Sequence, residues 1–262
     1  MKFHRINALL IRHLYLYQRS LPRIMDLVYW PVMDLLLWGF LSVYIAKFNA
    51  GGFNAITVLL GAIIFWDLFS QSQKAVSISF LEEVWERNFL NIFVTPLRIS
   101  EFLASSFLLG LLRIVAISLV LGALAFLLYH FNFFILGFAL IPCMANLLLF
   151  GFAIGLFANA VILRFGTSAQ ILAFGVIMLI QPFSAVFYPV SALPVFLQPP
   201  AYLFPSTYVF EGMRAVLATG TLPSNLLWGA ILSNIVYLVL TIWFFYRMFA
   251  YVKREGRLLK LD

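Results

Sequence analysis

Six apolar segments, each about as long as a bilayer-crossing helix, constrain this chain more than any other feature. With 64% hydrophobic and 10% charged residues, the chain carries more apolar surface than a water-facing fold could bury. A soluble enzyme, a disordered protein and a nucleic-acid binder are therefore excluded. We predict a single all-α integral membrane domain over residues 1–262, with six transmembrane helices. They are expected at Leu27–Ala46, Ala55–Gln73, Phe102–Leu128, Phe133–Leu163, Ala169–Val190 and Leu226–Ala250.

The distribution of lysine and arginine predicts the orientation. Of the 17 basic residues, 14 lie in the two terminal segments and in the second and fourth connections. Lys47 and Arg214 are the two expected on the opposite side, and Arg113 lies within a span. Because basic residues accumulate on the cytoplasmic side, both termini are expected in the cytoplasm. We expect a multi-pass membrane protein.

Residues 1–24 have the pattern of an amphipathic helix. At 100° per residue, Arg5, Arg12, Arg19 and Arg23 fall in one sector, and apolar residues including Phe3 fall opposite. This pattern predicts a helix lying in the membrane interface with its basic face toward anionic headgroups. The alternative is a cytosolic helix docked on the rest of the protein.

Two connections are too long to be turns. Residues 74–101 combine a charged cluster with large apolar groups, which is typical of a helix that faces membrane on one side and a partner on the other; a plain connecting helix is the alternative. Residues 191–225 hold five prolines among aromatic residues. This second composition predicts broken helices that re-enter the outer half of the membrane, with a flat interfacial loop as the alternative.

The sequence offers no enzyme site. It contains no Gly-Lys pair, so it holds no P-loop, and its three histidines do not have metal-ligand spacing. Its single cysteine, Cys143, excludes an intramolecular disulfide. No cofactor is expected on this chain.

Three ionisable residues lie within predicted spans, where burial is costly. Asp34, Asp67 and Arg113 could form a polar path or proton relay, or an Asp67–Arg113 salt bridge could lock two helices together. We favour the salt bridge, since three sparse charges make a poor relay. In the fourth span, Gly151 and Gly155 form a Gly-x-x-x-Gly pattern that indicates close helix packing, within one subunit or between two.

The stretch from Ala185 to Leu217 resembles the type-2 permease family of bacterial ABC exporters. The family pattern matches at Phe187 with Pro189, at Leu193-Pro194, at Pro205 and at Arg214. The cytoplasmic Thr95-Pro96-Leu97, with acidic residues upstream, also resembles the family's connection between the second and third spans. The layout of spans and loops is similar over the whole chain.

The resemblance implies a half-transporter of a bacterial inner membrane. It would pair with itself or a similar permease and work with two copies of a separate ATPase. ATP and Mg²⁺ would bind to that ATPase. Residues 82–96 would be the coupling element, with contacts at Glu82, Glu83, Trp85, Glu86, Arg87, Phe89, Thr95 and Pro96. The re-entrant helices would be Ser191–Phe204 and Ser206–Val216. Substrates of such exporters include polysaccharides, lipo-oligosaccharides and hydrophobic drugs.

Under this hypothesis the chain moves an amphipathic or lipid-linked substrate outward. Residues that line the path would hold the substrate by aromatic stacking or apolar contact. The candidate path residues are Asp34, Trp38, Trp66, Phe187, Tyr188 and Tyr208.

Two rival hypotheses remain. An ion-coupled secondary transporter would use Asp34 and Asp67, although the chain lacks internal repeats. A membrane-embedded enzyme or assembly factor is disfavoured by the lack of a catalytic cluster.

Overall fold

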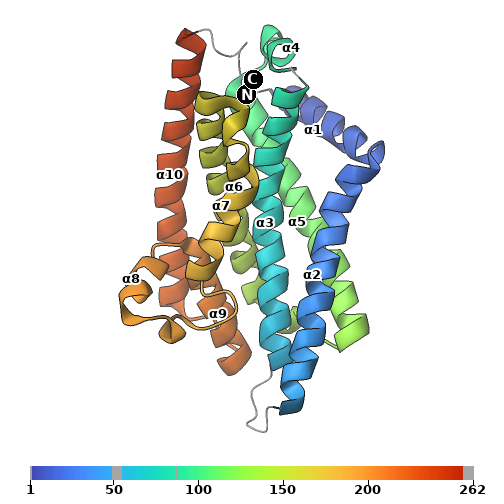
Figure 1. Cartoon of the computed structure of the whole chain (residues 1–262), viewed down its shortest axis with the longest axis vertical. Helices are drawn as coiled ribbons and strands as arrows, with labels where there is room; N and C mark the ends of the chain where they lie inside the picture. The colour runs from blue at the N-terminus through green and yellow to red at the C-terminus, as the bar shows by residue number, and fades with distance from the viewer. Residues whose placement is uncertain (1, 49–54, 87, 256–262) are drawn as a thin grey trace.

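The computed structural model describes residues 2–48, 55–86 and 88–255, and within these ranges the fold is a bundle of helices (Figure 1). The α-helices are α1 (Phe3–Gln18), α2 (Leu21–Phe48), α3 (Ala55–Trp85), α4 (Phe89–Val94), α5 (Ile99–Tyr129), α6 (Leu140–Phe165), α7 (Ile171–Ile180), α8 (Gln198–Ala201), α9 (Pro205–Thr219) and α10 (Ser224–Arg254). Short 3-10 turns occupy Phe133–Ala139, Gly166–Ala169, Gln181–Phe183, Val190–Ala192 and Val195–Leu197.

Five described helices are long and apolar enough to cross a membrane: α2, α3, α5, α10 and the helix that ends with α6. They correspond to five of the six predicted spans. The predicted span Ala169–Val190 is wrong in length, because its apolar helix covers only Ile171–Phe183. Pro182 lacks a backbone N–H, and Ala185 adopts a left-handed φ of 50°, so the helix cannot continue to Val190.

Helix α3 lies at the centre of the bundle, packed against α2, α5 and α6 (Figure 1). The Gly-x-x-x-Gly pattern of α6 is the reason for its close approach. A Cβ atom at Gly151 would lie 2.6 Å from Ser72 Cβ, and one at Gly155 would lie 2.6 Å from Val76 Cβ. The motif therefore packs two helices within one subunit.

Buried hydrogen bonds hold the same helices together. The Ser72 hydroxyl donates to the Leu148 carbonyl oxygen at 2.8 Å, and Asn159 Nδ2 donates to the Val76 carbonyl oxygen at 3.1 Å. Asn234 of α10 donates to Asn146 Oδ1 of α6 at 2.9 Å. Each bond satisfies a polar group that hydrocarbon would leave unsatisfied.

Helix α3 continues twelve residues past its predicted end at Gln73. No glycine or proline occurs between Lys74 and Glu86, so nothing in the sequence stops the helix there. The predicted connection 74–101 therefore begins as the last three turns of α3. The start of α1, the end of α10 and α4 lie at this same end of the bundle (Figure 1).

The opposite end holds α8 and α9. The predicted helix Ser191–Phe204 is wrong, because the chain there forms two 3-10 turns and the four-residue α8. Pro194, Pro199 and Pro200 remove the backbone donors that one continuous helix would need. The second predicted helix, Ser206–Val216, is α9, which packs against α10, α6 and α3.

Candidate functional site

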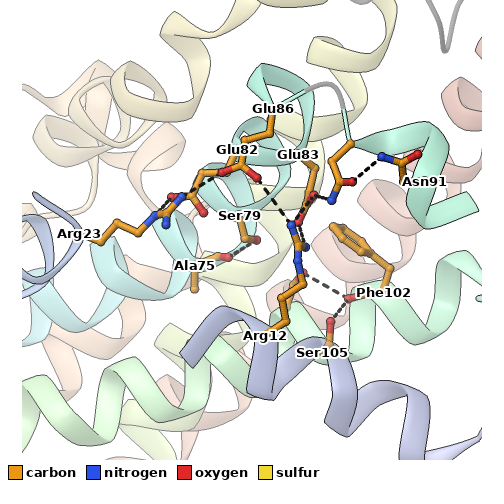
Figure 2. A network of polar contacts seen from close by, with 12 residues as sticks. Arg12, Arg23, Ala75, Ser79, Glu82, Glu83, Glu86, Asn91, Phe102 and Ser105 are labelled. Atoms are coloured by element: carbon orange, nitrogen blue, oxygen red, sulfur yellow. Dashed lines mark hydrogen bonds and ion pairs between the residues drawn. The ribbon is translucent and has the colours of Figure 1, made fainter. Parts of the chain in front are cut away.

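The basic side of α1 and the acidic end of α3 meet in a network of ion pairs (Figure 2). Arg12 binds the carboxylate of Glu83 through both terminal nitrogens, with Nη2 3.1 Å from Oε2. Its Nη2 also lies 3.6 Å from Glu86 Oε2. Glu83 is only 1% exposed and accepts a second hydrogen bond from Asn88 Nδ2 at 2.8 Å. Its buried charge is therefore satisfied from two directions.

Arg23, near the start of α2, extends the network. Its Nε lies 2.7 Å from Glu82 Oε1, and its Nη2 lies 3.2 Å from Glu86 Oε1 (Figure 2). Glu86, directly after α3, thus contacts both Arg12 of α1 and Arg23 of α2.

A second group of contacts fixes the start of α1. Glu101, in the first turn of α5, accepts hydrogen bonds from the backbone N–H of Lys2 at 2.7 Å and of Arg98 at 3.0 Å. Arg5 Nη1 lies 3.5 Å from Glu101 Oε2 and donates to the carbonyl oxygen of Pro96. The start of α1 therefore contacts both Pro96, between α4 and α5, and Glu101, in the first turn of α5.

These contacts correct the predicted orientation of residues 1–24. Arg5, Arg12 and Arg23 face carboxylates of the same chain rather than outward to headgroups. Phe3 and Tyr15 are exposed instead. Arg5, Arg12 and Arg23 therefore agree with the alternative prediction of a helix docked on the protein, whereas Arg19 is exposed.

His13 belongs to the docked helix α1 and is buried. Neither ring nitrogen has a hydrogen-bond partner among the described residues. Burial, followed by the positive charges of Arg12, Arg113 and Arg23, lowers the pKa of His13 to about 4. The imidazole is therefore neutral at pH 7 while α1 is docked.

The predicted coupling residues divide into two groups. Glu82, Glu83 and Glu86 are engaged with arginines of the same chain, whereas Trp85 is 49% exposed. The Trp85 indole Nε1 donates to Gln170 Oε1 at 3.3 Å. Sequence reasoning missed the arginine partners, although the matching arginine and glutamate clusters were a signal that could have found them.

The rest of the predicted coupling element surrounds α4. A cavity of about 410 Å³ separates α4 from α1, with Thr95 and Pro96 in its wall beside Asn88, Asn91, Arg5 and Arg12. Arg87 lies outside the described residues, and for Phe89 only the backbone, which begins α4, is described.

Two predicted path residues meet directly. The rings of Trp38, on α2, and Phe187, after α7, stack with centroids 4.0 Å apart and an angle of 15°. Asp34 lies one turn before Trp38 and is exposed. This pair connects α2 to the family-motif segment.

The remaining predicted path residues make other contacts. The Tyr188 hydroxyl donates to the Pro182 carbonyl oxygen at 2.6 Å, and Tyr208 packs against Gly229 of α10. Trp66 is buried in the core of the bundle, near Phe69.

The motif prolines begin successive elements. Pro189 and Pro194 cap the two 3-10 turns at their N-terminal ends, and Pro205 is the first residue of α9. Each position needs no backbone donor, so proline's fixed φ suits it.

Arg214 fastens this segment to α9. Its guanidinium donates to the carbonyl oxygens of Ala185 at 2.7 Å and Val186 at 3.2 Å, and it pairs with Glu211 at 3.2 Å. Glu211, which sequence reasoning missed, also accepts the Val190 N–H at 2.7 Å. Burial lowers the pKa of Arg214 from its ordinary value, and Glu211 opposes this shift.

The predicted Asp67–Arg113 salt bridge is wrong. Arg113 Cζ lies 4.9 Å from the ring centroid of Tyr17 on α1, and its Nε and Nη1 have no partner among the described residues. Asp67 instead interacts electrostatically with Asp34 and Lys74. Asp67 and Arg113 therefore have different neighbours, since the Arg113 guanidinium faces Tyr17 of α1.

The described helices, five of them long and apolar enough to cross a membrane, define a multi-pass α-helical membrane protein. Among the described residues no cluster of three His, Cys, Asp or Glu side chains could hold a metal ion. A sequence profile of the family described as ABC-2 type transporter matches residues 14–218. The chain belongs to this family, and so is the membrane domain of an ABC transporter, a kind of permease that associates with an ATP-binding subunit. A comparison with curated proteins gives no match.

Proposed function

We propose that this chain is the permease subunit of an ATP-driven exporter in a bacterial inner membrane, with both termini in the cytoplasm. Two permeases, identical or similar, would assemble with two copies of a separate ATPase that binds ATP and Mg²⁺. The family match carries this proposal. The shared position of the start of α1, the end of α10 and α4 supports the orientation, since most basic residues lie at that end.

The ATPase would bind around Trp85 and α4. Trp85 is a large exposed aromatic side chain, the type of residue that anchors protein interfaces. The cavity between α1 and α4 offers space for a partner side chain beside Arg5 and Arg12. Thr95 and Pro96 form the adjoining rim.

Closure of the ATPase pair would move α4 and the end of α3 together. Helix α3 is continuous from Ala55 to Trp85, so it would carry this displacement into the membrane. The ion pairs from Glu83 to Arg12 and from Glu82 to Arg23 would carry it to α1 and α2. Opening would follow at the interface between two permeases.

The substrate would be amphipathic or lipid-linked: a polysaccharide, a glycolipid or a hydrophobic drug. The Trp38–Phe187 stack supports an aromatic contact for a sugar or acyl chain. Exposed apolar side chains on α2, including Trp30, Leu37 and Phe40, support a surface covered by lipid or by a second permease.

Affinity purification from native membranes in mild detergent tests the proposal. We expect a P-loop ATPase to co-purify with the wild type and to be reduced at least tenfold by W85A. W228A is the matched control, because Trp228 is also exposed but lies near the start of α10, at the opposite end of the bundle. Absence of any ATPase from the wild-type preparation contradicts the proposed function. Equal loss in W85A and W228A contradicts the coupling surface alone.

A further inference from the structure

Three arginines at one end of α6 and α10 surround a cavity of about 450 Å³. Arg164 lies in the last turn of α6, while Arg247 and Arg254 lie two turns apart on α10. Tyr251 also lines the cavity. This space is many times the roughly 30 Å³ that one water takes up.

These arginines differ from those of the α1 network. Arg5, Arg12 and Arg23 each pair with a carboxylate. In contrast, none of the cavity's three arginines forms an ion pair with an acid in the part of the chain that the structure describes. Helices α6 and α10 contain no acidic residue at all. Three like charges around one cavity repel one another, and an anion within it would remove that repulsion.

Aromatic rings hold two of these guanidinium groups in place. Arg164 Cζ lies 5.5 Å from the centroid of Phe165 and 5.4 Å from that of Tyr251, and Arg247 Cζ lies 5.9 Å from that of Trp243. Such stacking uses the face of a guanidinium and leaves its N–H edge available, and that edge matches a phosphate group.

The cavity begins, at Arg247, beside a surface of exposed apolar and aromatic residues of the kind that faces lipid. Trp243 and Phe165 are each 60% exposed, and exposed apolar residues continue along α10 through Val239 and Leu240. Arg247 lies one helical turn beyond Trp243, about 6 Å along the axis. The headgroup layer begins at the end of the apolar surface and is about 5–7 Å thick.

We propose that this cavity binds the phosphate-containing headgroup of an anionic phospholipid in the leaflet at this end of the bundle. The charge, the stacked guanidinium groups and the adjoining lipid-facing surface together favour a lipid over a soluble anion, because the exposed aromatic and apolar residues would contact its acyl chains. The bound lipid would bridge α6 and α10.

Binding of short-chain phosphatidylglycerol to the purified full-length protein in detergent tests this site. Phosphatidylcholine of the same chain length and inorganic phosphate are the comparison ligands, with thermal shift and native mass spectrometry as readouts. We expect phosphatidylglycerol to bind to the wild type. R164Q/R254Q should weaken its affinity about 25-fold, or about fivefold for each arginine.

K253Q is the matched control, because Lys253 is an exposed neighbour on α10 that does not line the cavity. We expect K253Q to bind within about twofold of the wild type. R164K/R254K keeps the charge but loses the planar edge, so we expect an intermediate loss and a usable variant if the glutamine pair does not fold.

Four results would overturn the proposal. If phosphatidylcholine binds equally well, the site does not select an anionic headgroup. If inorganic phosphate binds equally well, the site binds a soluble anion and not a lipid. If K253Q weakens lipid binding as much as R164Q/R254Q does, general charge attraction explains the binding and the cavity does not. If R164Q/R254Q binds lipid as the wild type does but no longer co-purifies with the ATPase, the arginines belong to a protein interface.

Discussion

Arg12 and Glu83 join helix α1 to the end of α3 through a two-pronged ion pair, with Nη2 and Oε2 3.1 Å apart. The pair links positions 71 residues apart in the sequence. Glu83 is buried, so it depends on Arg12 and Asn88 for all its described polar contacts.

Removing Arg12 should therefore release α1. We expect R12Q to destabilise the docked helix by about 2 kcal/mol, because Glu83 keeps a buried charge with one partner fewer. Faster hydrogen exchange in Phe3–Gln18 measures this loss. R19Q is the control, since Arg19 is exposed and has no described side-chain partner. Unchanged hydrogen exchange in R12Q, or equal acceleration in R19Q, would contradict a role for the Arg12–Glu83 ion pair in docking α1.

The contact between α6 and α3 makes a second prediction. In G151A the new Cβ would lie 2.6 Å from Ser72 Cβ and 2.9 Å from the Phe69 carbonyl oxygen, so one helix must shift. We expect a destabilisation of about 1–3 kcal/mol, measured by thermal unfolding in detergent. G175A serves as the comparison, because its Cβ would meet Ile171 at an ordinary 3.9 Å. A G151A protein as stable as G175A would show that the helices separate easily.

Local patterns predicted most of the fold. Long apolar runs fixed five spans, and the Gly151–Gly155 spacing indicated a close approach. The partner of that motif was not predictable, because spacing describes one helix surface while Ser72 and Val76 lie on another. At Pro182 the apolar pattern continued although the backbone did not, so composition alone overestimated the helix.

The site was predicted less well than the fold. An arginine sector suits both lipid headgroups and carboxylates, and the linear pattern cannot choose between them. Arg23 and Glu82 are separated by 59 residues, so only the tertiary fold brings them together. Trp38 and Phe187 were both proposed as path residues from residue type; the structure stacks their rings, and their role in a path stays a prediction.

The separation of Asp67 from Arg113 makes a third prediction. Because the two residues do not pair, exchanging them in D67R/R113D should not rescue either single change, and thermal unfolding of all three variants measures this. Rescue by the exchange would show that the pair forms in another conformation.

The same aspartate separates ATP-driven from ion-coupled transport. We expect D67N to fold as stably as the wild type or better, because Asp67 Oδ2 is buried without a described partner and the amide carries no charge. ATP-dependent transport in inside-out vesicles should continue with D67N and after collapse of the proton gradient. Loss of transport under both conditions would favour ion coupling through Asp34 and Asp67.

The neutral, buried His13 predicts that acid loosens α1. Its pKa is about 4 when docked but near 6.5 when exposed, so between these values the undocked helix binds a proton that the docked helix does not. Docking is strongest above pH 6.5 and weakens as the pH falls toward 4, by about 2 kcal/mol at pH 5. Hydrogen exchange of Phe3–Gln18, corrected for the intrinsic effect of pH, should therefore accelerate between pH 7.5 and 5. H13L keeps an apolar side chain that does not titrate, so its exchange should change little over this range. Equal pH dependence in H13L and the wild type would assign the effect to the surrounding carboxylates instead.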